Sequence, residues 1–143
     1  MFIGKYYHKL ESNGRIALPK SFRDEQNDWV ITRGLDGSLF LFSAESFATE
    51  VAKFEARSFT KKINRDFVRL MTNEAQKVGV DKNGRVQLPE YLIEFAQLQK
   101  DIVIVGSLSR VEIWDRNRYH HYLDEIENQA EAIAEALSES ANE

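Results

Sequence analysis

The chain has 143 residues, 43% of them hydrophobic and 29% charged, with a formal net charge of −4 and no cysteine. These values exclude two large domains, a disordered chain, disulfides, and any thiol-based or cysteine-ligated metal site. No apolar run reaches the ~18 residues of a membrane span, and residues 1–10 lack the apolar core of a secretion signal, so we expect a cytoplasmic protein.

The chain contains an internal repeat. Residues 11–19, ESNGRIALP, recur 70 positions later as residues 81–89, DKNGRVQLP. The similarity continues downstream, where residues 29–42 parallel residues 102–114. Each half then has the pattern strand, tight turn, strand, short helix, strand, turn, strand. Because halves of this size have poorly self-sufficient cores, we expect them to bury their apolar faces against each other as one interlocked body.

The repeated Asn-Gly pair predicts a β-hairpin in each half. In the second half, a three-residue loop at residues 82–84 places Val80 opposite Val86. The next inward pair is then Val78 with Leu88, which gives one apolar face. A two-residue loop would mix polar and apolar residues on each face, so the longer loop is preferred.

The same register in the first half places Leu10 opposite Ile16, and His8 opposite Leu18. The last residue of each loop is a glycine, which readily adopts the left-handed backbone conformation that this loop requires. These loop-forming glycines are Gly14 and Gly84.

This register leaves a carboxylate and an arginine side by side on the outer face of each loop. The pairs are Glu11 with Arg15, and Asp81 with Arg85. One interpretation is a cross-strand ion pair that contributes ~0.2–1 kcal/mol and nothing else. The other is that the acid orients the arginine toward a phosphate or a guanine edge. In that case net attraction must come from nearby lysines, namely Lys5, Lys9 and Lys82.

Several other elements are predicted on either side of the loops. Pro19 and Pro89 stand where proline can start a helix. Residues 29–33 and 38–42 read as two strands joined by a turn, and residues 102–105 as a fully buried strand. We expect these elements to form the scaffold.

Residues 44–76 are predicted to be a helical connection with apolar residues at helical spacing, and we expect its aromatic residues to pack in the core. These apolar residues are Phe47, Val51, Phe54, Ile63, Phe67 and Leu70. Residues 53–69 also hold six cations against two carboxylates. The expected divisions of the chain are 1–52 (first half), 53–76 (basic helical connection), 77–118 (second half) and 119–143 (acidic helix and tail).

Residues 119–137 show the periodicity of an amphipathic helix that could cap the body or contact a neighbouring subunit. Residues 121–143 carry seven carboxylates and no lysine or arginine, so residues 1–120 have a net charge of +3. The acidic face is interpreted either as a solvated surface or as a contact to a basic patch or a protein partner.

These residues resemble the MraZ transcriptional regulators, which share the AbrB-like swapped-hairpin architecture. The resemblance covers roughly residues 1–137. It rests on the opening MFIG, the two acid-x-x-x-Arg motifs that each lead to Leu-Pro, the segment ITRGLDGSLFLF, and VEIWD at 111–115. It implies a mainly β fold with short helices (α+β). In that fold two pseudo-repeat halves form an interlocked swapped-hairpin β-barrel, followed by the C-terminal amphipathic helix.

The resemblance further implies a bacterial regulator that binds short tandem DNA repeats upstream of its own division and cell-wall operon. It also implies a homo-oligomer, with rings known in the family, and association with the nucleoid. Carried over by motif, the arginines are Arg15 and Arg85, and the arginine-orienting acids are Glu11 and Asp81. The candidate DNA-binding residues are Arg15, Arg85, Lys5, Lys9, Asn13 and Lys82. Among them we expect Arg15 to contribute most, because the first hairpin is the more basic one.

The sequence departs from the family pattern at two positions. Glu11 replaces the common Asp, and Asn13 stands where a lysine is frequent. The longer acid should still reach Arg15, whereas the missing cation should weaken or shift contact by the first loop. Asn13 can itself donate and accept hydrogen bonds at a base edge.

Two other function classes are an enzyme and a protein-interaction module. The chain lacks GxxxxGK, GxGxxG, HExxH and GxSxG, so we expect no enzyme and no cofactor. The adjacent His120 and His121 point about 100° apart on a helix, which disfavours one compact metal site. The alternative function is a protein-interaction module, antitoxin-like or scaffold, with non-specific DNA affinity. Such antitoxins are expected to have one hairpin unit per chain and a disordered tail.

Overall fold

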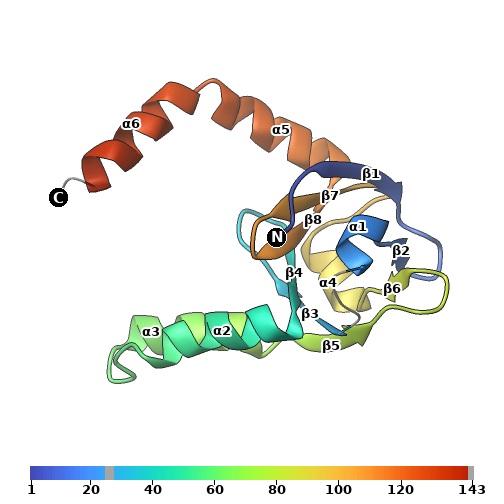
Figure 1. Ribbon diagram of the computed structural model, residues 1–143, viewed down its shortest axis with the longest axis horizontal. Coiled ribbons are helices and arrows are strands. Elements are labelled where there is room, and N and C mark those ends of the chain that lie inside the picture. Colours follow the sequence, from blue (N-terminus) through green and yellow to red (C-terminus); the bar gives the residue numbers. More distant parts are fainter. Residues whose placement is uncertain (25–27, 142–143) are drawn as a thin grey trace.

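The computed structural model describes residues 1–24 and 28–141 and has an α+β fold (Figure 1). The strands are β1 (Lys5–Lys9), β2 (Arg15–Ala17), β3 (Asp28–Arg33), β4 (Leu39–Ser43), β5 (Gln76–Gly79), β6 (Arg85–Gln87), β7 (Asp101–Ser107) and β8 (Arg110–Asp115). The helices are α1 (Lys20–Arg23), α2 (Ala44–Glu55), α3 (Lys62–Thr72), α4 (Glu90–Phe95), α5 (Arg116–Glu127) and α6 (Ala130–Ala141). None of the helices in these ranges is long and apolar enough to cross a membrane.

The sheet order relates the two halves of the chain. Six antiparallel strands run in the order β1-β7-β8-β4-β3-β5, and β2 pairs with β6 in a separate two-stranded sheet. The order is symmetric between the halves: if β1, β3 and β4 are exchanged with β5, β7 and β8, the same order results, read from the opposite edge of the sheet. The first strand of each half therefore pairs with the third strand of the other half, so neither half completes its sheet alone.

Both three-residue loops form as predicted. The Glu11 N–H donates to the Arg15 carbonyl at 2.9 Å, and the Asp81 N–H donates to the Arg85 carbonyl at 2.9 Å. The glycine that ends each loop has a positive φ, 83° in the first loop and 78° in the second. The local turn chemistry thus decides the loop conformation.

The predicted pair next to the second loop is confirmed, because Val80 lies opposite Val86. The next pairs of the predicted ladders are wrong. Because β1 pairs with β7, His8 lies opposite Ile102 instead of Leu18. Likewise Val78 lies opposite Trp29, and not opposite its predicted partner after β6. The two arms of each hairpin separate because β2 and β6 turn away to pair with each other inside the core. Turn residues predict where the chain reverses direction, but they do not predict which strand pairs with each of the two segments that flank the turn.

One core spans both halves. Its residues are fully or almost fully buried and include Ile16, Leu18, Phe22, Trp29, Ile31, Leu41, Val86, Leu88, Leu92, Ile102, Ile104 and Ile113. The predicted short helices α1 and α4 follow Pro19 and Pro89, and each contributes one of these residues. The predicted strands are also present as β3, β4 and β7, with ends that differ by one or two residues. The small halves are thus stabilised by burial against each other.

The predicted helical connection contains two helices that project from the body. Helices α2 and α3 contact each other through Phe54 and Phe67, whose ring centroids are 4.6 Å apart. The expectation that the aromatic residues of this region pack in the core is wrong, because Phe47, Phe54 and Phe67 are only partly buried. Ile63 is 76% exposed. Helical spacing identified the helices but not the depth at which they pack.

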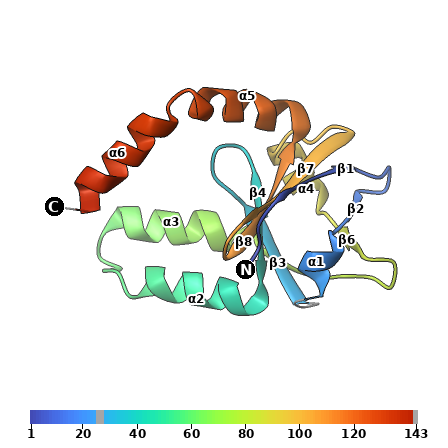
Figure 2. The same ribbon diagram turned by 45° about the horizontal axis from the view of Figure 1, so that its top comes forward.

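The single helix predicted at the C-terminal end is two helices. Helix α5 packs against the body through Tyr119 and Tyr122, whose rings lie 5.5 and 5.2 Å from the Trp114 ring. It ends at Glu127 with Asn128 as its C-cap, and α6 follows with every described residue exposed. Figure 2 shows α5 and α6 as a bent arm that leaves the body. Glu143, counted in the acidic segment, lies outside the described residues.

Helices α2, α3, α5 and α6 have 11 or 12 residues each. The fold is therefore a more even mixture of helix and antiparallel sheet than the mainly β fold with short helices that the sequence predicted.

Candidate nucleic-acid interface

Two loops lie side by side at one end of the body, away from α2, α3 and α6 (Figures 1 and 2). We call residues 11–15 the first loop and residues 81–85 the second loop. Each loop is tied to the other half by one backbone hydrogen bond. The Leu18 N–H donates to the Gly84 carbonyl and the Leu88 N–H to the Gly14 carbonyl, both at 3.0 Å. The two loops consequently form a single rigid surface.

The carboxylate of the first loop does not pair with the arginine of its own loop. Glu11 Oε2 instead accepts a hydrogen bond from Arg85 Nε, with a separation of 3.0 Å, across the two loops. Arg85 Nη1 also donates to the Asn83 carbonyl at 2.8 Å. The predicted Glu11–Arg15 pair is therefore wrong, and the acid of the first loop neutralises the arginine of the second.

Asp81 holds its own loop rather than a guanidinium. Its Oδ1 accepts backbone hydrogen bonds from Asn83 at 2.8 Å and from Arg85 at 2.9 Å. The Arg85 backbone bond is the main cause that lowers the pKa of Asp81, and the charges of Arg15 and Arg85 lower it further. Asp81 thus stays ionised and acts as a fixed acceptor within the second loop.

Arg15 has different surroundings from Arg85. Its Nε donates to Gln87 Oε1 at 3.2 Å, and its backbone N–H donates to Asn13 Oδ1 at 3.1 Å. Among the described residues, its terminal nitrogens Nη1 and Nη2 have no recorded partner. Arg15 is exposed, so the guanidinium fork is directed by a neutral amide and remains available to an external acceptor.

Sequence reasoning did not identify Gln87. The repeat contained a usable signal, because Gln87 occupies the position that Ala17 holds in the first half. In the two-stranded sheet Gln87 lies opposite Arg15, whereas Ala17 lies opposite Arg85. Only the pairing of β2 with β6 shows that the Gln87 side chain lies next to Arg15.

The candidate lysines are not gathered at one point. Lys9 forms an ion pair with Asp101 of β7, which holds the pKa of that carboxyl below its usual value. Lys5 lies about 13 Å further along β1, and its ammonium is 5.8 Å from the centre of the Tyr119 ring on α5. Lys82 is exposed on the second loop. The structure therefore brings Lys82 to the loop surface and directs Lys5 away from it.

The two adjacent histidines have separate partners. His120 Nε2 lies 3.0 Å from the Tyr7 hydroxyl, and the two rings stack. His121 Nε2 lies 3.4 Å from Glu125 Oε1 one turn along the helix. Within residues 1–24 and 28–141, no group of three or more metal-ligating side chains comes together.

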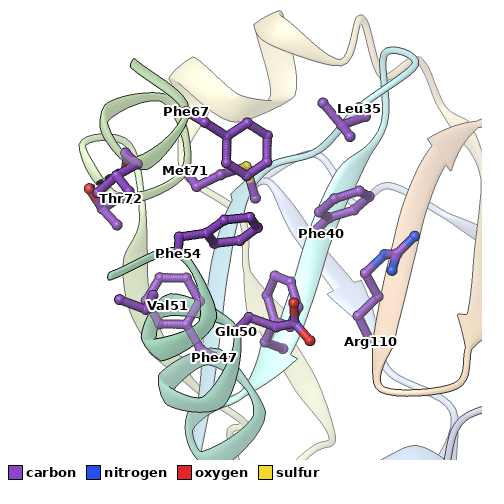
Figure 3. Close-up of a pocket in the computed structure, with 12 residues that line it drawn as sticks. Leu35, Phe40, Phe47, Glu50, Val51, Phe54, Phe67, Met71, Thr72 and Arg110 are labelled. Carbon is purple, nitrogen blue, oxygen red and sulfur yellow. Dashed lines mark hydrogen bonds between the residues drawn. The ribbon is translucent and has the colours of Figure 1, made fainter. Parts of the chain in front are cut away.

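A pocket lies elsewhere, between helices α2 and α3 and strand β4 (Figure 3). Its walls are mainly apolar and include Phe40, Phe54 and Phe67. The Arg110 guanidinium lies over the Phe40 ring at 4.4 Å, and its Nη2 donates to Glu112 Oε2 at 3.0 Å. Its buried Nε has no hydrogen-bond partner among the described residues. This pocket is separate from the two loops.

Comparison with known proteins identifies the family. The matching family model is described as "MraZ protein, putative antitoxin-like" and matches the chain twice, over residues 1–70 and 71–140. A protein of Acetivibrio thermocellus named Transcriptional regulator MraZ is 39% identical over 139 residues, which make up 96% of this chain and 97% of that protein. Proteins of the same name from Moorella thermoacetica and Pediococcus pentosaceus are 40% and 41% identical over 138 residues, with 96% of this chain and 96% of each relative covered. The chain belongs to the MraZ family.

Proposed function

We propose that this chain is a transcriptional regulator that binds double-stranded DNA through the first and second loops. The observation that carries the proposal is the exposed Arg15 guanidinium, which a rigid loop presents with both terminal nitrogens unused by the described residues. A planar guanidinium with a free fork suits a guanine edge or a phosphate. The names of its relatives support the same role.

The proposed operator is a set of short tandem repeats upstream of the protein's own division and cell-wall operon. One loop surface contacts few bases, so specificity requires several subunits that place equivalent surfaces on successive repeats. We therefore propose a homo-oligomer, a ring as in the family, that associates with the nucleoid in the cytoplasm. Arg85, Asn13, Lys9 and Lys82 would assist Arg15, with Lys5 as a more distant contributor.

The proposed architecture is a swapped-hairpin barrel built from two pseudo-equivalent halves. The sheet order supports it, because β1 and β5 each complete the sheet of the other half. The paired hydrogen bonds between the loops support it as well. With this architecture we propose the divisions 1–52, 53–76, 77–118 and 119–143 as the functional parts of the chain.

Fluorescence anisotropy tests the proposal directly. The protein is titrated onto a duplex of its own upstream region and onto a scrambled duplex, at two salt concentrations. We expect preferential and salt-sensitive binding, which Arg15→Ala abolishes without unfolding the protein. Arg57→Ala is the matched control, since Arg57 is exposed at the far end of the body beyond α2 and forms no ion pair with any residue that the structure describes. Equal binding of wild-type protein to both duplexes would contradict the proposal.

A second candidate is a protein-interaction module with non-specific DNA affinity. The observation in its favour is a set of exposed apolar side chains: Phe59 between α2 and α3 is 79% exposed, Ile63 on α3 76% and Leu137 on α6 67%. Clustered apolar exposure marks contact surfaces for other proteins. Equal affinity for the two duplexes, together with a protein partner that protects these residues from exchange or labelling, would favour this function over the first.

A further inference from the structure

We propose that Gln87 is a positioning residue for Arg15: its neutral amide orients the guanidinium toward DNA without neutralising it, so the first loop carries the dominant cationic contact. The inference rests on the proposed function and deepens it. It names a residue outside both loops and assigns unequal roles to the two arginines.

The first step is the geometry of the amide. Gln87 Oε1 accepts from Arg15 Nε at 3.2 Å, and Gln87 Nε2 donates to the Asn13 carbonyl at 2.8 Å. Both ends of the amide are used by complementary partners, which fixes its orientation. Gln87 therefore ties the Arg15 side chain and the backbone of the first loop to strand β6 of the other half.

The second step is the contrast with Arg85, which occupies the corresponding place in the second half. Arg85 Nε is bonded to the Glu11 carboxylate at 3.0 Å, and Arg85 Nη1 to the Asn83 carbonyl at 2.8 Å. The Glu11–Arg85 pair has no net charge, whereas the Arg15–Gln87 pair retains a full positive charge. A polyanion is attracted more strongly to the second arrangement.

The third step asks whether Asp81, the other acid near Arg15, binds its guanidinium. The charge of Arg15 contributes to the lowered pKa of Asp81, so the two groups are within electrostatic reach of each other. No hydrogen bond between their side chains is recorded among the described residues. The Asp81 oxygen that is engaged accepts backbone N–H groups of Asn83 and Arg85 instead. Gln87 is consequently the direct side-chain partner of the Arg15 guanidinium.

The fourth step is that one position encodes the asymmetry. Antiparallel pairing of β2 with β6 places Gln87 opposite Arg15 and Ala17 opposite Arg85. Alanine has no group to donate or accept, so Arg85 has no amide partner and takes the Glu11 carboxylate. The difference between Ala17 and Gln87 thus gives the two arginines different partners.

The test begins with Gln87→Glu, which replaces the neutral partner of Arg15 by a carboxylate. We expect affinity for the upstream duplex to fall about tenfold or more, and the slope of log affinity against log salt to decrease by about one. Gln76→Glu is the matched control, because Gln76 is exposed on β5 and the substitution makes the same change in net charge. The control should stay within about twofold of wild type.

The same substitution in an Arg15→Ala background shows whether the effect acts through Arg15. There we expect Gln87→Glu to change residual DNA affinity by less than about twofold. Thermal melts of each variant confirm that the protein is folded. Gln87→Ala, which removes orientation but not charge, should reduce discrimination between upstream and scrambled duplexes while the salt slope is retained.

The outcomes separate this inference from the proposed function. If wild-type protein does not prefer the upstream duplex, the proposed function fails. If wild type prefers it but Gln87→Glu behaves like Gln76→Glu, or loses the same affinity with and without Arg15, only the positioning role of Gln87 is overturned.

Discussion

The first and second loops have the same backbone, but their arginines have different partners. In both, the N–H of the leading acid bonds to the carbonyl of the arginine at 2.9 Å, and a glycine with positive φ closes the turn. In the second loop the arginine is paired with a carboxylate, and in the first with an amide. The comparison teaches that an internal repeat can preserve a loop conformation while single side chains next to the loop decide what it binds.

The largest expected difference between the two loops appears when each arginine is removed separately. Arg15→Ala should abolish preference for the upstream duplex, whereas Arg85→Ala should retain a measurable preference because Arg85 is already neutralised by Glu11. Anisotropy titrations of both variants give the ratio of the two losses. Equal losses would show that the ion pair does not withhold Arg85 from DNA, and that the loops act alike.

The shared backbone can be tested through its glycines. A Cβ at Gly84 would lie 2.5 Å from Arg23 Nη1, at a φ of +78° that side chains disfavour. We expect Gly84→Ala to lower the free energy of unfolding by about 1–2 kcal/mol. Gly79→Ala is the control, since no atom of the described residues lies within 4 Å of its Cβ position and its φ is not positive. Urea unfolding of both variants checks this, and similar midpoints would contradict the strained-turn argument.

The sequence patterns predicted the local structure well, but they predicted poorly which strands pair and which side chains contact each other. The Asn-Gly loops, the helices after both prolines and the strands β3, β4 and β7 follow from turn chemistry, capping and periodicity, which act over a few residues. Strand partners, the Glu11–Arg85 ion pair and the role of Gln87 depend on how the two halves interlock. That arrangement joins residues that are far apart in the sequence, such as Arg15 and Gln87, and no local pattern reports it.

The helices show the same division. Apolar spacing predicted helix in residues 44–76 and 119–137, and helices α2, α3, α5 and α6 are present there. The spacing did not predict that Ile63 would be 76% exposed or that α5 would end at Glu127. Periodicity shows that a face is apolar, but the partner that covers the face decides its burial.

A smaller effect is expected from restoring charge to the second loop. Glu11→Gln leaves an acceptor for Arg85 Nε but removes the carboxylate, so Arg85 is no longer neutralised and the surface formed by the two loops becomes more positive. We expect DNA affinity to rise a few-fold at low salt and less at high salt. The pair is partly exposed, so the free energy of unfolding should change by less than about 1 kcal/mol. An unchanged or reduced affinity would argue that Arg85 does not face DNA even when its charge is restored.

The smallest expected effect is on the pH dependence of thermal stability, and it concerns Asp81, the acid that begins the second loop. The folded-state pKa of Asp81 is lowered, chiefly by the Arg85 backbone hydrogen bond, so the ionised form is favoured in the folded protein. Asp81 therefore stabilises the fold above its unfolded pKa of about 3.9, and this contribution disappears as pH falls through the lower folded pKa. Asp81→Asn should reduce the loss of thermal stability between about pH 5 and pH 3. Melting curves across that range test it. A variant with the wild-type pH slope would show that the backbone bonds to Asp81 do not depend on its charge, and the second loop would then owe its conformation to the glycine alone.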